Sequence, residues 1–146
     1  TRVLQEPMQV VLPAEHPLAK KDSLSPDDLK GEIILTVEPS HHLNEQIVRL
    51  CNETGAVHTR DYEGTSLDTL RQMVAAGMGI SLLPTLYVRS EVMREELVVA
   101  RPLFPRAPVR NISIAWRRGA LRERTYSALY DSFRDSLRNW EAEQLV

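Results

Sequence analysis

Residues 64–84 read GTSLDTLRQMVAAGMGISLLP, a stretch that contains the start and the end of one helix and the strand that follows it. Ser66 is a good N-cap residue, because its hydroxyl oxygen can accept a hydrogen bond from a backbone N–H group of the first turn. The apolar positions that follow recur at helical spacing: Leu67, Leu70, Val74 and Gly77. This pattern predicts an amphipathic helix that begins at Ser66 and packs one face against a core.

The end of the same stretch predicts a strand. Gly77 and Gly79 suit a left-handed helix stop followed by a tight turn. Residues 80–83 form a short, mostly apolar segment, as in a buried strand, and Pro84 cannot continue the hydrogen-bond ladder. A helix that runs directly into a buried strand is typical of α/β proteins.

The rest of the chain repeats this alternation. We expect strands over residues 7–12, 33–37, 57–62, 97–100 and 110–116, a helical turn over 25–29, and helices over 42–52, 86–95 and 122–140. The last helix has one apolar face, formed by Tyr126, Leu129, Phe133, Leu137 and Trp140. Strands that alternate with helices predict an α/β fold with a largely parallel sheet.

Composition narrows the class of protein. The chain has 146 residues, 42% hydrophobic and 26% charged, which fits one globular domain rather than a disordered segment. Its formal net charge of −2 gives the chain as a whole no electrostatic footprint for nucleic acid. It contains no apolar run of membrane-spanning length and no signal peptide, so we expect a cytoplasmic location and no membrane partner. Because the chain starts at Thr1 without Met, we expect a fragment.

An enzymatic function is not expected. The sequence contains no Gly-x-Ser-x-Gly, phosphate-binding loop, HExxH or dinucleotide fingerprint. Asp61 and Glu63 lie two residues apart without a recognisable acid–base partner. We therefore expect neither a catalytic residue nor a cofactor.

Three further stretches, together with residues 64–84, identify a resemblance. They are EHPLA at 15–19, EPSHHL at 38–43 with the helix that runs to Cys51 and ETGA at 53–56, and the strand 112–116 with its closing helix. The combination resembles the effector-binding domain of LysR-type transcriptional regulators, and within that family the OxyR-like group, over nearly the whole chain.

This resemblance implies a periplasmic-binding-protein-like fold, in which two α/β lobes are joined by two crossing strands and bind the effector in the cleft between them. By analogy, residues 1–7 form a crossing segment, 8–99 the second lobe, and 100–146 the returning strand and C-terminal helix of the first lobe. The helix-turn-helix and the first part of the regulatory domain are not in this sequence.

The loop between the strand 33–37 and the next helix is the expected effector site. The carboxyl ends of strands are where α/β sheets bind ligands, and the positive end of a helix dipole favours an anion or a polar oxygen. The candidate residues are Ser40, His41, His42, Glu45, Thr65 and Ser66. Local capping and hydrogen bonding by the two histidines is the competing interpretation. The pairs His41–Glu45 and His42–Glu45 have helical spacing, but a stable metal site needs three or four ligands, so we expect no metal.

The resemblance also bears on redox chemistry. In OxyR proteins this loop carries a His followed by the peroxide-reactive Cys; His41 matches that His, and His42 stands where the cysteine would be. Cys51 matches the second cysteine of the OxyR disulfide. As the sole cysteine it cannot form an internal disulfide, which also fits a reducing cytoplasm. It is either a small buried residue or a redox-active thiol.

We therefore expect a ligand- or redox-responsive regulatory domain of a DNA-binding LysR-type regulator. The resemblance implies a homodimer or homotetramer that pairs through the exposed face of the helix starting at Ser66, a small-molecule or oxidant effector, and DNA bound through the absent helix-turn-helix. The alternative is a solute-binding receptor of the same two-lobed fold. A signal peptide or lipid-attachment cysteine upstream would indicate the receptor, and a helix-turn-helix the regulator.

Overall fold

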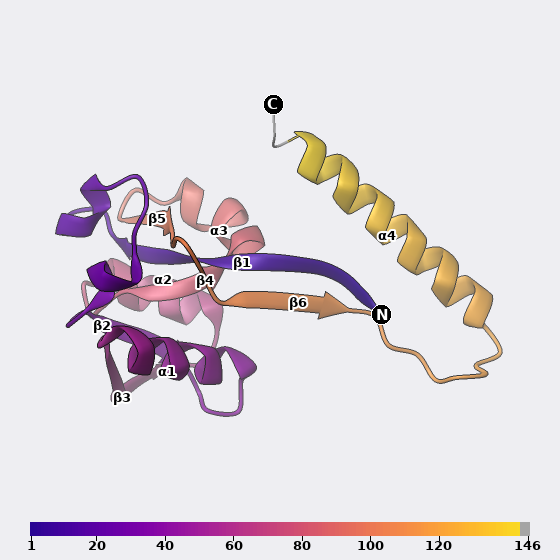
Figure 1. Ribbon diagram of the computed structural model, residues 1–146, viewed down its shortest axis with the longest axis horizontal. Coiled ribbons are helices and arrows are strands. Elements are labelled where there is room, and N and C mark those ends of the chain that lie inside the picture. Colours follow the sequence, from indigo (N-terminus) through magenta and orange to yellow (C-terminus); the bar gives the residue numbers. More distant parts are fainter. Residues whose placement is uncertain (144–146) are drawn as a thin grey trace. The chain divides into compact units, whose positions relative to one another are not determined.

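The computed structural model describes residues 1–143, with side chains as far as residue 139. The chain separates into two compact units (Figure 1). One unit is Pro7–Val109, and the other combines residues 1–6 with the chain from Arg110 onward. The predicted boundaries at residues 7 and 99 concern lobes of a larger domain, and that assignment stays a prediction.

The unit Pro7–Val109 contains most of the strands. They are the later part of β1 (Arg2–Pro13), together with β2 (Ile33–Val37), β3 (Val57–Gly64), β4 (Ser81–Pro84) and β5 (Val98–Pro102). β1 lies between β4 and β5 and is antiparallel to both, whereas β2 and β3 are parallel. Ile80, the residue before β4, pairs with β2. The N–H of Leu35 donates to the oxygen of Ile80 at 2.8 Å, and the N–H of Ile80 donates to the oxygen of Ile33 at 2.9 Å.

The α/β fold class is confirmed, but the expectation of a largely parallel sheet is wrong. β2, β3 and the start of β4 are connected through helices, and such crossovers produce parallel neighbours. β1 reaches none of its sheet neighbours through such a crossover helix. It therefore runs against β4 and β5, which are separated from each other by β1.

Helices cover both faces of the strands. They are α1 (His42–Thr54), α2 (Leu67–Ala75) and α3 (Thr85–Ser90), with short 3₁₀ turns at Pro17–Lys20, Pro26–Leu29 and Val92–Arg94. Val10, Ile34 and Leu82 pack in one core cluster with α1, whereas their neighbours Val11, Leu35 and Leu83 pack in another with α2 and α3. Because successive residues of a strand point to opposite faces, the helices form two layers around the sheet.

The segment that predicted the fold has its expected helix. Ser66 is the N-cap of α2, and its Oγ accepts a hydrogen bond from the N–H of Thr69 at 3.2 Å. Gly77 has the left-handed φ of +77°. Gly79 does not share that conformation; instead, a Cβ atom there would lie 2.7 Å from the oxygen of Ile33. Gly79 thus permits β2 and the start of β4 to approach each other.

Other boundaries differ modestly from the expectation. β1 begins at Arg2 rather than at residue 7, and the helix expected over 86–95 divides into α3 and a 3₁₀ turn. The strand expected over 110–116 is β6 (Val109–Ser113).

The second unit consists of the beginning of β1, most of β6 and α4 (Glu123–Glu143). β6 pairs with β1, and the guanidinium of Arg110 donates from Nε to Oε1 of the buried Glu6 at 2.6 Å. On α4, Leu129 and Phe133 are 47% and 50% exposed. The predicted apolar face of α4 is therefore largely uncovered in this chain; the side chain of Trp140, which was assigned to it, lies outside the described residues.

Candidate functional site

The predicted effector residues come from two neighbouring strand ends. Val37, the last residue of β2, is in register with Gly64, the last residue of β3. Beyond them, the N–H of Glu38 donates to the oxygen of Gly64 at 3.2 Å. Since β2 and β3 are parallel, the loops that lead to α1 and α2 leave the same edge of the sheet, which we call the β2–β3 edge.

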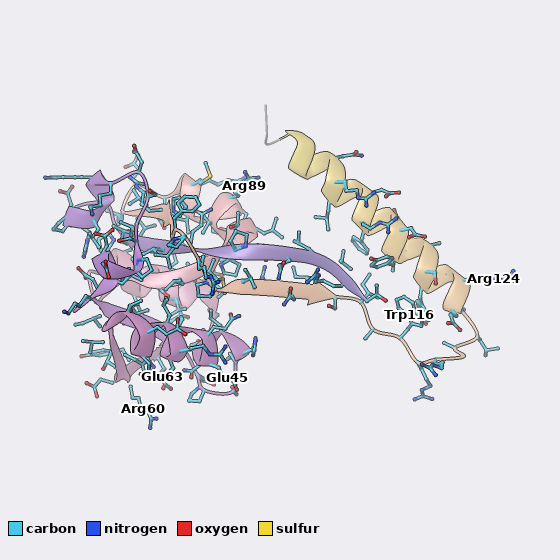
Figure 2. The ribbon with its side chains drawn as sticks, viewed as in Figure 1. Glu45, Arg60, Glu63, Arg89, Trp116 and Arg124 are labelled. Atoms are coloured by element: carbon cyan, nitrogen blue, oxygen red, sulfur yellow. The ribbon has the colours of Figure 1, made fainter. Side chains whose placement is uncertain are left out.

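All six predicted residues are exposed at this edge: Ser40, His41, His42, Glu45, Thr65 and Ser66. Figure 2 labels Glu45 on α1 and Glu63 on β3. The structure thus brings the two segments that carry the candidates to one edge. Among the described residues, no hydrogen bond or ion pair joins a candidate of one loop to a candidate of the other.

The two histidines have different local roles. His41 is the N-cap of α1 through its backbone, and its side chain makes no capping hydrogen bond. Nδ1 of His42 lies 3.3 Å from Oε2 of Glu45, but these side chains are 80% and 69% exposed. An exposed pair of this kind contributes little to stability, so both imidazoles remain available for a ligand.

The hydroxyls on the other loop are partly occupied. Oγ of Ser66 accepts the capping hydrogen bond, and Oγ1 of Thr65 lies 3.4 Å from Oγ1 of Thr69. Helices α1 and α2 both begin at the β2–β3 edge, where the free N–H groups of their first turns and their helix dipoles create positive potential. The arrangement suits an anionic or oxygen-rich ligand.

Two polar residues near the edge escaped the sequence analysis. Asn44 is buried, and its Nδ2 donates to the oxygen of Val37 at 2.8 Å, which holds the first turn of α1 on the end of β2. Thr36 is fully buried, and its hydroxyl has no hydrogen-bond partner within residues 1–143. Only the polarity of Thr36 within an apolar strand could have drawn attention to it.

Cys51 lies inside the core, as one of the two interpretations expected. It is 4% exposed and packs in the same cluster as Ile47 and Leu50 of α1. Burial raises the pKa of its thiol to about 11. Since the thiolate is the reactive form, this environment suppresses its reaction with oxidants.

The described part of the chain contains neither a cluster of metal ligands nor a membrane-spanning helix. No group of three or more His, Cys, Asp and Glu side chains there could hold a metal ion. His16 and Glu32 approach each other, with Nε2 and Oε2 at 3.1 Å, but they form only a pair. None of the described helices is both long and apolar enough to cross a bilayer.

Comparison with known proteins agrees with the fold and the motifs. The family described as "LysR substrate binding domain" matches residues 1–138. The hydrogen peroxide-inducible genes activator of Dickeya chrysanthemi is 37% identical over 135 residues, which cover 92% of this chain and 44% of that protein. The DNA-binding transcriptional dual regulator OxyR of Escherichia coli K12 is 38% identical over 132 residues, 90% of this chain and 43% of OxyR.

A solved structure extends the agreement to three dimensions. The crystal structure of the oxidized form of OxyR has a TM-score of 0.77 and 36% identity, and the match covers 92% of this chain and 63% of that one. The chain spans less than half the length of these curated relatives. It belongs to the LysR substrate-binding domain family and is an OxyR-like regulatory domain of a LysR-type regulator.

Proposed function

We propose that this domain serves a cytoplasmic, DNA-binding transcriptional regulator as the sensor of a small-molecule or oxidant effector, which binds at the β2–β3 edge. The observation that carries the proposal is the parallel pairing of β2 with β3, which brings the loops that lead into α1 and α2 to the same edge of the sheet. Exposed imidazole, hydroxyl and carboxylate groups surround these helix starts. Such a site favours a polar or anionic ligand.

The regulator would act as a homodimer or homotetramer and bind DNA through a helix-turn-helix in a part of the protein outside this chain. Effector binding would change the arrangement of the regulatory domains and hence of the DNA-binding heads. An effector can shift that equilibrium only if it binds one arrangement better than the other. The relatives support this proposal, since they are named as regulators and activators. They favour it over the solute-binding receptor.

The proposal assigns His42 to the position of the peroxide-reactive cysteine. With Cys51 as the sole cysteine of the chain, oxidation cannot produce a disulfide within it. An oxidant response through this segment would require a Cys51-linked dimer or a Cys51 adduct. The raised pKa of Cys51 opposes both, which shifts the functional weight to ligand binding at the β2–β3 edge.

Thermal-shift screening of the full-length protein tests this proposal. A metabolite library and hydrogen peroxide would be screened against wild type, Ser40→Ala and His42→Ala. Ser40 and His42 are exposed, so these variants should retain the fold. We expect a ligand that raises the Tm of wild type and raises it less in both variants. Equal shifts in all three proteins would place the effector site elsewhere.

A further inference from the structure

A concave site lies between the later turns of α1 and the segment that connects β5 to β6. We call it the α1 pocket; its volume is about 280 Å³. Its walls are Gln46, Arg49, Leu50 and Glu53 on one side and residues 106–109 on the other. The four α1 residues have the spacing of a single helix face. None of the six β2–β3 edge residues lines this pocket.

Both walls of the α1 pocket carry an arginine. Arg49 lines it from α1, and Arg106 from the connecting segment. Neither guanidinium forms an ion pair or hydrogen bond with any other described residue, and neither does the carboxylate of Glu53, which lines the same pocket. Two cationic groups against one carboxylate leave an excess of positive charge among the residues that line the pocket.

Hydrogen bonds hold the two walls together. Nε2 of Gln46 donates to the oxygen of Val109 at 2.7 Å, which ties α1 to the connecting segment. The oxygen of Pro108 accepts from the N–H of Met8 at 2.8 Å, which ties that segment to β1. The ring of Pro108 also fixes its own φ and restricts Ala107, the residue after Arg106. The backbone of the two walls is therefore preorganised, so a ligand would have to order mainly the two arginine side chains.

We propose that the α1 pocket binds a small organic anion whose carboxylate or phosphate groups bridge Arg49 and Arg106. Guanidinium groups form paired, charge-assisted hydrogen bonds with both kinds of anion. The volume lies just below the ~300–1,000 Å³ of pockets for drug-sized ligands, which fits a small metabolite. Such a ligand would fasten α1, the helix that begins at the β2–β3 edge, to the segment that leads into β6.

Titration calorimetry on the full-length protein, with inorganic phosphate and succinate as probes, tests this inference. The proteins compared are wild type, Arg49→Gln, Arg106→Gln and the control Arg60→Gln. Arg60 is exposed on β3, and Figure 2 shows its side chain projecting away from the ribbon. We expect at least one probe to bind wild type and the control equally, and about tenfold or more weaker to each pocket variant, because each loses one charged partner.

The outcomes separate this site from the proposed effector site. His42→Ala should leave the binding of these probes unchanged, whatever its effect on an effector. Chemical-shift mapping of wild type should locate the perturbed amides at residues 46–53, 106, 107 and 109, which needs no variant to fold. Absence of binding by both probes would overturn the inference. Equal weakening in Arg60→Gln, or perturbations centred elsewhere, would also overturn it.

Discussion

At the scale of single residues, the environment of Cys51 determines its chemistry. A pKa raised by burial from 9.0 to about 11 leaves roughly a hundredfold less thiolate near neutral pH. We therefore expect native protein at pH 7.5 to react with iodoacetamide about a hundredfold more slowly than an unperturbed thiol. The rate should rise about tenfold per pH unit up to the raised pKa. Mass spectrometry of timed samples measures this rate.

The raised pKa of Cys51 also makes the stability of the fold depend on pH. The folded state favours the neutral thiol, so protonated Cys51 contributes to the free energy of unfolding. This contribution is complete below the unfolded-state pKa and is lost as pH rises from about 9.0 through about 11. Protein unfolded in urea supplies the fast reference for alkylation, and Cys51→Ser supplies the blank. Rapid labelling of native protein, or a peroxide-induced dimer absent from Cys51→Ser, would show that the thiol is accessible.

At the scale of elements, two neighbouring hydroxyls at the start of α2 have different roles, because Ser66 caps the helix and Thr65 does not. Ser66 Oγ accepts a backbone hydrogen bond from Thr69, whereas the Thr65 hydroxyl, among the described residues, has a hydrogen-bond partner only in the Thr69 hydroxyl. We expect Ser66→Ala to lower the free energy of unfolding by about 1 kcal/mol, and Thr65→Ala to lower it by much less. Urea denaturation of both variants measures the difference. Equal losses would mean that the cap does not set the stability of α2.

The sequence predicted those elements whose signals are local. Ser66 and Gly77 mark the two ends of a helix through their own backbone and side-chain preferences, and both do so in the structure. Strand direction is a different matter, because it depends on which distant segment lies alongside. Nothing local to β1 indicates that it is antiparallel to β4 and β5.

The two candidate sites differ in the same respect, because one follows from local sequence signals and the other from packing. The β2–β3 edge could be predicted, because strand–loop–helix order places Ser40 and Thr65 at carboxyl ends of strands. The α1 pocket could not, because Arg49 and Arg106 are far apart in sequence and line one pocket only through the packing of α1 against the β5–β6 segment. The structural role of Asn44 likewise depends on the position of Val37.

At the scale of the whole molecule, α1 connects the proposed effector site to the core of its unit. His42 begins the helix at the β2–β3 edge, and Cys51 lies nine residues later in the buried cluster. Nine helical residues span about 13.5 Å along the axis. A disulfide needs Cα atoms within roughly 4.4–6.8 Å, so a cysteine at position 42 could not reach Cys51 while α1 is intact.

The variant His42→Cys makes this geometry testable. In native buffer with peroxide, we expect slow internal crosslinking, in proportion to the loss of the helical circular-dichroism signal, because α1 must unwind and withdraw Ile47 and Leu50 from the core. Non-reducing mass spectrometry gives the crosslinked fraction, and His42→Cys combined with Cys51→Ser is the control. Complete crosslinking with an unchanged helical signal would show that the two positions meet without unfolding α1. The coupling of residue 42 to the core would then be absent, and an effector at the β2–β3 edge would have to act through the loops alone.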